Sequence, residues 1–408
     1  MLSNDALNNL MKPIIDRQEN INKYVVDLIA KRIKEIGHLK PSDIHKLERL
    51  LQSGADVRKI NEYISAQTGL QVQDIKKLIR EVALDSYISA KPFYDYRHLP
   101  FISFSKNQPL QNVVKAIELQ TLGTYKNMSG ATAFMLRDMK NPKKLIPTSI
   151  AKTYQTVVDE AIQAVQSGTI DYHTAMRRTL KQLNESGLRE VTYNTESGRI
   201  YTQRLDTALK RNLSDGVRAI NQGVQNEVGK QFKSDGKEIS VHGMSAPDHE
   251  PVQGHQFTNE EYDKLQSSQP FEDVDGEKFD PIERHIGQYN CRHFTWSIIL
   301  GISKPNYTKE QLQALKDKNK SGYTLPNGKH LTLYECEQKM REMETAIRRA
   351  KEGQMASQEA GDMDLARQYR AKVVSLTKKY KAFCKEAGLM PHMDNASVPG
   401  YKTISLKV

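Results

Sequence analysis

Apolar residues recur at helical spacing along most of this 408-residue chain, and this pattern constrains its fold more than any other feature. Steps of three and four residues place such side chains on one face of an α-helix. One such stripe comprises Ile21, Tyr24, Val25, Leu28, Ile29, Ile33 and Ile36. The pattern predicts a helix-rich protein.

The composition agrees with a helical protein that exposes much surface. Only 38% of the residues are hydrophobic and 7% aromatic, and the mean hydropathy is −0.65. So polar a chain suits an elongated protein, or one that buries surface in an assembly, better than a compact enzyme. The longest apolar run, residues 296–302, is far shorter than a membrane span, and no secretory signal is present. We therefore expect a soluble protein without a membrane segment.

The net charge is +11 and the sequence pI is about 9.2. A basic excess favours polyanionic partners, nucleic acid first. The alternative is that the positive charge is spread along solvated helix faces, because Lys and Arg alternate with acidic residues and form no dense block. The three cysteines, Cys291, Cys336 and Cys384, are far apart and odd in number. They do not form a disulfide framework, and a reducing compartment is expected.

We predict an α+β fold that is predominantly helical and divided into four parts. These are an N-terminal helical region (1–105), a middle helical region (106–188), a small α/β core (189–305) and a C-terminal antiparallel helical hairpin (306–408). Two heptad-like series predict the hairpin: Cys336, Met340, Met343, Ile347 and Ala350, then Leu365, Tyr369, Val373, Leu376, Tyr380 and Phe383. Gly388 is expected to end the second helix.

Within the N-terminal half, Pro41 and Ser42 predict a helix start, and Gly54 predicts its end. Two further helices are predicted at residues 56–69 and from Gln71 onward.

The aromatic-rich segment 86–108 is broken by two prolines and predicts an extended linker. Its aromatic residues would pack the linker onto a neighbouring domain, and stacking on single-stranded nucleic acid is the alternative. Residues 127–147 are expected to be rich in loops.

The pattern changes after residue 189 and predicts the α/β core. Residues 191–202 alternate around a turn, which indicates a β-hairpin. A long helix at 203–234, a strand at 238–242 and a short helix at 260–267 are predicted to follow.

The most distinctive residues of the chain lie within and between two short stretches, 242–257 and 287–303. Its cluster of potential metal ligands comprises His242, Asp248, His249, His255, His285, Cys291 and His293. Cys291 and His293 are two residues apart, so an extended backbone points both side chains the same way. Zinc accepts mixed nitrogen, sulfur and oxygen ligands. One hypothesis is therefore a zinc site built from Cys291, His293 and one or two of His242, Asp248 and His249.

The absence of CxxC or HExxH spacing favours a second interpretation, in which these residues are hydrogen-bonded within packed loops. A Cys291 nucleophile activated by a nearby histidine is a third. A ββα nuclease hairpin is not evident, because an apolar, strand-like run follows Arg292. No catalytic residue is assigned.

These residues resemble the tailed-phage minor capsid protein 2 family, which looks related to the Mu F-like head morphogenesis proteins. Within the two stretches the resemblance is carried by His242, Pro247, His249, Pro251, Gln253, Gly254, Gly287, Asn290, Cys291, Arg292, His293, Gly301 and Ile302. It extends to residues 167–178, 186–189, 197–199, 334–341 and 383–389. The family usually has Arg where Ala246 stands and Trp where Val252 stands, which weakens an active-site interpretation of the first stretch.

The resemblance implies a structural virion protein of the phage head, present in few copies and acting near the portal in head morphogenesis. The implied partners are the portal protein and capsid or scaffold proteins, with non-specific contact to packaged DNA during packaging or ejection. The implied location is the virion, and the host cytoplasm during assembly. The family brings no established catalytic activity or cofactor. The alternatives are a zinc-dependent hydrolase or nuclease carried in the head, and a non-specific DNA-binding protein.

Overall fold

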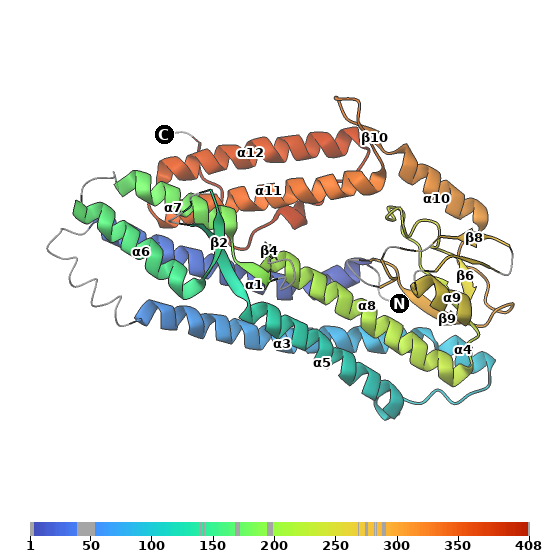
Figure 1. Ribbon diagram of the computed structural model, residues 1–408. Coiled ribbons are helices and arrows are strands. Elements are labelled where there is room, and N and C mark those ends of the chain that lie inside the picture. The colour runs from blue at the N-terminus through green and yellow to red at the C-terminus, as the bar shows by residue number, and fades with distance from the viewer. Residues whose placement is uncertain are drawn as a thin grey trace. The chain divides into compact units, whose positions relative to one another are not determined.

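Helices predominate in the computed structural model, and short antiparallel sheets accompany them (Figure 1). The structure describes residues 4–38, 54–138, 141, 143–167, 172–193, 199–267, 269–273, 276–280, 282, 284–287 and 291–406. The predicted α+β, predominantly helical fold class is therefore confirmed. The predicted helix between Pro41 and Gly54 lies almost entirely outside the described residues.

The described α-helices are α1 (Asn4–Gly37), α3 (Ala55–Ser89), α4 (Lys91–Tyr96), α5 (Gln108–Gly130), α6 (Ile150–Ser167), α7 (Tyr172–Ser186), α8 (Leu205–Phe232), α9 (Asn259–Gln266), α10 (Lys309–Ser321), α11 (Leu333–Glu359) and α12 (Met363–Glu386). The 3-10 helices are η2 (Phe104–Lys106) and η3 (Met393–Ala396). The strands are β1 (Thr132–Arg137), β2 (Leu145–Ser149), β3 (Arg189–Tyr193), β4 (Ile200–Arg204), β5 (Gly236–Ile239), β6 (Gln256–Thr258), β7 (Phe271–Glu272), β8 (Lys278–Phe279), β9 (Thr295–Ile298), β10 (Tyr323–Thr324) and β11 (His330–Leu331).

The chain forms two compact units. The first unit comprises residues 1–12, 72–125 and 210–339, and the second comprises residues 13–71, 126–209 and 340–408. The division into four parts along the sequence remains a prediction.

The prediction of separate helices before and after Gly69 was wrong, because α3 is continuous from Ala55 to Ser89. A glycine inside a helix costs about 1 kcal/mol relative to alanine, which the burial of a neighbouring apolar stripe can offset. Ile60, Ile75 and Ile79 are all fully buried on this helix. The stripe therefore continues past Gly69 and outweighs its low helix propensity.

The prediction of an extended linker at residues 86–108 was also wrong. The segment holds the end of α3, the short helix α4 and the 3-10 helix η2. Pro92 lies in the first turn of α4, where a helix tolerates proline. The aromatic residues do pack, as the sequence suggested: Tyr87 stacks on Phe101 with ring centroids 4.5 Å apart, and Phe93 stacks on Phe232 at 5.0 Å.

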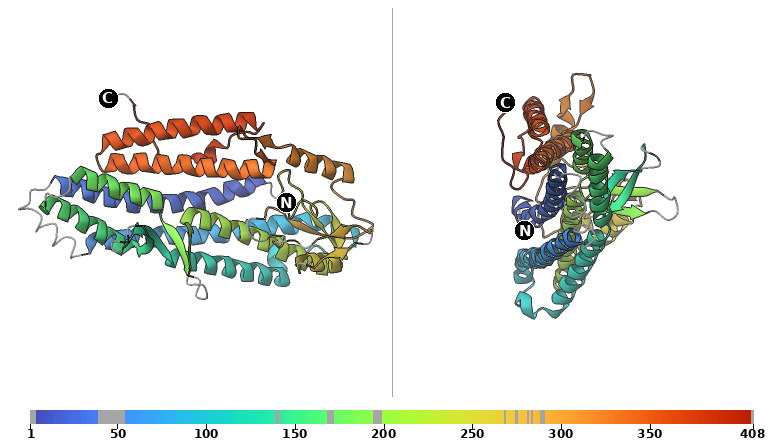
Figure 2. Two further views of the ribbon diagram at one scale, coloured as in Figure 1. Left: turned by 45° about the horizontal axis from the view of Figure 1, so that its top comes forward. Right: turned by 90° about the vertical axis from the view of Figure 1, so that its left-hand side faces the viewer.

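The second unit contains a four-stranded antiparallel sheet in the order β2-β1-β3-β4, packed against α6 and α7 (Figure 2). The predicted hairpin is confirmed as β3 and β4, which pair from Arg189↔Arg204 to Tyr193↔Ile200. The loop-rich prediction for residues 127–147 was wrong, because β1 and β2 form a second hairpin there. Consecutive residues of β1 are buried, so the polar–apolar alternation that would have indicated a strand is missing.

The predicted C-terminal hairpin is confirmed as α11 and α12, which run side by side (Figures 1 and 2). Met340, Ile347 and Ala350 of α11 are buried, as are Val373, Tyr380 and Phe383 of α12. The connection between them is short, because α11 continues to Glu359 and α12 begins at Met363. The Asp362 carboxylate then accepts from Leu365 N–H and caps α12. Gly388 follows α12 with φ +66°, as expected of a helix stop.

A network of buried charges also lies in the second unit. The Arg204 guanidinium donates to both carboxylate oxygens of Glu352 (2.7 and 3.0 Å) and to Asp206 (3.2 Å). Arg348 donates to Glu19 (2.9 Å) and to the other oxygen of Asp206 (3.0 Å). Each acid in this network therefore contacts at least one arginine.

The first unit contains a three-stranded antiparallel sheet in the order β6-β5-β9. Helix α8 packs closely on β9, because a Cβ at Gly229 would lie 2.5 Å from Ser297 Oγ. Around this sheet lies a cluster of buried residues, with Phe271 packed against it: Ile239, Val252, Phe257, Tyr262, Leu265, Phe279, Ile282, Ile286 and Cys291. The core of the first unit thus reaches the second of the two stretches that the sequence marks as distinctive.

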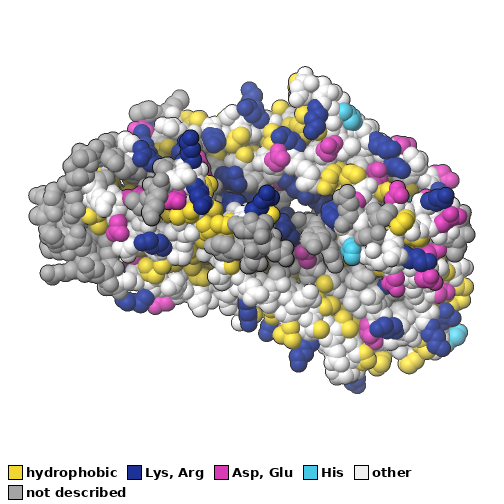
Figure 3. Space-filling view, viewed as in Figure 1, with side chains coloured by type: hydrophobic (Ala, Val, Ile, Leu, Met, Phe, Trp, Pro, Cys, Tyr) yellow, Lys and Arg dark blue, Asp and Glu magenta, His cyan; other side chains and the backbone are white. Residues whose placement is uncertain are grey.

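Two surface properties bear on function. No helix in the described part of the chain has the length and apolar character that crossing a membrane requires. On the face shown in Figure 3, Lys and Arg side chains are interspersed with Asp and Glu side chains. This face agrees with the alternative in which the net charge of +11 is spread along solvated helices.

Candidate metal centre

The pairing of β5 with β9 brings the two distinctive stretches to one end of the sheet. The last residue of β5, Ile239, pairs with the first residue of β9, Thr295. Beyond this pair, Ser240 N–H donates to the Phe294 carbonyl (2.8 Å), and Phe294 N–H donates to Ser240 Oγ (2.8 Å). The residues that follow β5 and the residues that precede β9 therefore lie side by side at this end of the sheet.

A compact series of turns then points His249 inward. Its N–H donates to the Ala246 carbonyl (3.0 Å), and its own carbonyl accepts from Gln253 N–H (3.1 Å). Gly254 closes the loop by donating to the Ile239 carbonyl (2.9 Å) with φ +77°. A Cβ at Gly254 would lie 2.4 Å from Leu312 Cδ2, so both conformation and packing require glycine there.

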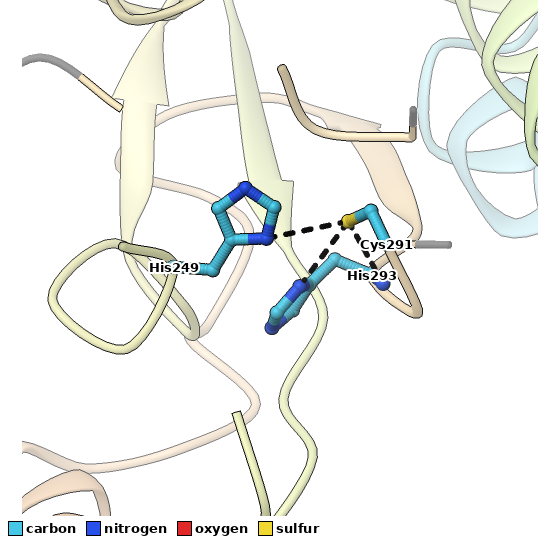
Figure 4. A group of neighbouring side chains, drawn as sticks. All are labelled: His249, Cys291 and His293. Atoms are coloured by element: carbon cyan, nitrogen blue, oxygen red, sulfur yellow. Dashed lines mark hydrogen bonds between the residues drawn. The ribbon is translucent and has the colours of Figure 1, made fainter. Parts of the chain in front are cut away.

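His249, Cys291 and His293 meet in this region (Figure 4). Their ligand atoms lie within 4.8 Å of one another. Cys291 Sγ is 3.5 Å from His249 Nδ1 and 3.5 Å from His293 Nδ1. The exposed fractions are 1% for His249, 3% for Cys291 and 1% for His293. The structure thus brings together three of the four residues predicted as metal ligands, one from the first stretch and two from the second.

Hydrogen bonds fix the tautomers of both histidines. The Nε2–H of His249 donates to the Arg284 carbonyl (2.6 Å), which can only accept. The Nε2–H of His293 donates to Gln253 Oε1 (3.2 Å). That Gln253 atom must be the oxygen, because it also accepts the His242 main-chain N–H (3.1 Å). In the neutral rings, both Nδ1 atoms therefore present a lone pair to the Cys291 sulfur.

The electrostatic environment favours a Cys291 thiolate and a neutral His293 ring. Burial raises the pKa of the Cys291 thiol, but its contact with His249 and the main-chain hydrogen bonds from Gly287 and His293 together outweigh burial and bring the pKa below its usual value. Burial lowers the pKa of the His249 ring, but the Cys291 contact, the Arg284 carbonyl and the Asp248 charge together outweigh burial and raise it. Burial, together with the charges of nearby His and Arg side chains, lowers the pKa of His293 well below its ordinary value. Thiolate sulfur and neutral imidazole nitrogen are the forms that bind metals.

The fourth predicted ligand, His242, lies beside this group without belonging to it. Its ring centroid is 4.3 Å from that of His293. Burial and the charge of Arg292 lower the pKa of His242 to about 4, so its ring is neutral. Of the other candidates, His255 bonds to the Gln253 carbonyl through Nδ1 (3.1 Å), and His285 is likewise outside the group.

Asp248 serves as an ion-pair partner. Its carboxylate oxygens accept from Arg284 at 2.6 and 2.9 Å, and one of them lies 3.5 Å from His249 Nε2. Arg284, whose carbonyl orients His249, was missed by sequence reasoning because nothing in its local sequence distinguishes it. Gln253 was noted only as part of the family resemblance, and its role depends on the fold.

The arrangement fits a ligand set better than a nucleophile. Cys291 contacts His249, and His249 lies near Asp248, which is the order of a nucleophile, a base and an orienting acid in a catalytic triad. However, the His249 Nε2–H bonds a main-chain carbonyl at 2.6 Å, while Asp248 is 3.5 Å away. The sulfur is also part of the hydrophobic cluster, where a substrate would have to displace packed side chains. Burial is compatible with a closed, structural metal site.

Comparison with known proteins gives one match. A family model described as phage minor capsid protein 2 matches residues 2–385, which include both distinctive stretches. No curated protein and no solved structure shows a significant match. Because the family model covers nearly the whole chain, the chain belongs to the phage minor capsid protein 2 family.

Proposed function

We propose that the protein is a portal-associated component of the phage head that acts in head morphogenesis. The family match over residues 2–385 carries this proposal. Membership makes the chain a structural phage protein of the virion that interacts with other virion proteins. The portal as direct partner, low copy number and assembly in the host cytoplasm are the proposed refinements.

The C-terminal hairpin supports the proposal as a contact arm. Helix α12 leaves two large apolar side chains exposed, Met363 at 42% and Val374 at 41%, and Met390 beyond it is 79% exposed. Contiguous exposed apolar patches, rather than single apolar side chains, are typical of surfaces that bind another protein. This surface would bind the portal or a neighbouring head protein.

A phage with the gene deleted tests the proposal. We expect few finished heads or poor DNA delivery, restored when the wild-type gene is supplied in trans. Mass spectrometry of purified virions should detect the protein at low copy, and chemical cross-linking should join it to the portal protein. Absence from particles together with normal titres contradicts the proposal. Cross-links only to the major capsid protein contradict the portal contact.

A matched pair of variants tests the contact arm. Val374→Glu should reduce the amount of protein incorporated into heads, because it places a charge on the exposed apolar surface. Ser375→Glu, at the neighbouring exposed position, adds the same charge and should leave incorporation unchanged. Equal incorporation of both variants argues against this surface.

Non-specific DNA contact is the second proposed role, and the net charge of +11 favours it. Binding through phosphates weakens steeply with salt, because bound counterions are released. A gel shift with duplex DNA that weakens as salt rises would support this role. Either no shift or a salt-insensitive one would count against it.

A further inference from the structure

We propose that His249, Cys291 and His293 bind one zinc ion, which fastens the loop after β5 to the segment before β9. The ligand atoms would be the two Nδ1 atoms and the sulfur of Cys291. Burial of all three side chains favours a structural role, and a fourth ligand would complete the tetrahedron. The proposal is independent of the portal contact.

A count of hydrogen atoms shows that the cluster is incomplete without a cation. Both Nε2 hydrogens are already donated, to Arg284 O and Gln253 Oε1. Two Nδ1 lone pairs therefore face one sulfur, and a thiol carries a single hydrogen. If Cys291 donates to one ring, the other ring keeps a buried lone pair that faces the sulfur without a donor. Such unsatisfied polar groups are rare inside proteins because each costs about 1–3 kcal/mol.

Protonating His249 does not remove the difficulty. An imidazolium could donate Nδ1–H to a Cys291 thiolate, but the His293 lone pair would then face a full negative charge at 3.5 Å. A divalent cation satisfies both nitrogens and the sulfur at once. Binding displaces one proton from the thiol and none from the neutral rings.

The two distances from the sulfur to the nitrogens fit zinc. With Zn–S near 2.3 Å and Zn–N near 2.0 Å, tetrahedral geometry separates a sulfur and a nitrogen ligand by about 3.5 Å. Both Sγ–Nδ1 distances are 3.5 Å. Zinc histidines also donate their second N–H to a carbonyl or carboxylate, as both rings do here. A thiolate with two imidazoles favours zinc over magnesium or calcium, which prefer oxygen.

Metal analysis of the full-length wild-type chain is the first test, using protein purified without a metal-affinity tag. We expect about one zinc per chain, retained on dialysis and removed by a strong chelator. Cobalt added to the metal-free protein should give tetrahedral d–d bands and a thiolate-to-cobalt charge-transfer band. Metal-free protein that binds neither zinc nor cobalt overturns the proposal, and this result needs no variant.

Variants assign the ligands. Cys291→Ser should abolish the charge-transfer band, and His293→Ala should lower zinc affinity by orders of magnitude. Cys336→Ser removes a buried thiol of the same unit outside the cluster, and His242→Gln removes the ring beside it. Both controls should keep the metal. A charge-transfer band that survives in Cys291→Ser and disappears in Cys336→Ser overturns the assignment, and circular dichroism confirms that each variant is folded.

Discussion

Each of the two units contains a cluster of polar side chains. The two clusters differ in how far their polar groups find partners within the chain. In the second unit, Arg204 and Arg348 lie among Asp206, Glu352 and Glu19, and every charge meets an opposite charge within 3.2 Å. In the first unit, two histidine lone pairs share one sulfur. In the first arrangement each carboxylate is paired with an arginine of the chain itself, whereas the second lacks a positive centre.

This difference separates two uses of buried polar groups. A closed ion network contributes to the stability and specificity of a fold, although its desolvation offsets much of the attraction. A convergent set of acceptors instead indicates a ligand from outside the chain. Four perturbations, which begin with the largest expected effect, test this distinction.

Arg204→Leu should give the largest loss of stability. It leaves Glu352 without its bidentate partner and Asp206 with one arginine fewer, both in a buried setting. Removing one member of a buried ion pair typically costs about 3–5 kcal/mol. Chemical unfolding followed by circular dichroism measures the change.

A matched control is Arg367→Leu in the same unit, which breaks an ion pair with Asp364, a residue that is 68% exposed. Exposed pairs contribute about 0–1 kcal/mol. Equal losses in the two variants would show that the buried network has no special role.

Zinc removal should destabilise the first unit by an amount that depends on the metal concentration. With free zinc about 100-fold above its Kd, the native state gains about 2.7 kcal/mol. A chelator should therefore lower the melting temperature of the wild type, while Cys291→Ser should not respond. Identical responses of the two proteins would show that the stabilising metal binds elsewhere.

Gln253 tests whether the orienting hydrogen bonds belong to the metal centre. Gln253→Leu removes the acceptor of the His293 Nε2–H, and such outer partners change metal affinity by about 10–100-fold. Gln253→Glu keeps an acceptor and should restore most of the affinity. Competition with a zinc indicator measures both variants. If Leu and Glu weaken binding equally, Gln253 acts by packing alone.

Much of the fold was predictable because helical periodicity is a local signal. The α11–α12 hairpin follows from apolar steps of three and four, and Gly388 ends it as glycine at this position should. The failures occurred where packing overrides a local signal. Gly69 did not interrupt α3, and the buried strand β1 carries no alternation. The prolines of the 86–108 segment begin or flank short helices instead of extending the chain.

The candidate site was predictable only in part. The spacing of Cys291 and His293 placed both side chains together, and His249 was named among their partners. What sequence could not provide is the pairing of β5 with β9, which decides that His249 rather than His242 joins the group. The fixed tautomers depend on a carbonyl at Arg284 and an amide at Gln253, and both are products of tertiary structure.

The last perturbation tests a pH dependence that belongs to the ion network alone. Burial, together with the nearby Asp206 and Glu352 charges, outweighs Arg348 and raises the pKa of Glu19 from 4.5 to about 7. Between these values the folded protein holds a proton that the unfolded chain has released, so stability falls as pH rises from about 5 to 8. Glu19→Gln abolishes this titration. We expect the unfolding free energy of the variant to rise relative to that of the wild type by up to about 2–3 kcal/mol over that interval. Unfolding midpoints across the pH range measure this difference. Parallel curves for the two proteins would show that the Glu19 carboxyl stays ionised throughout and would contradict the prediction.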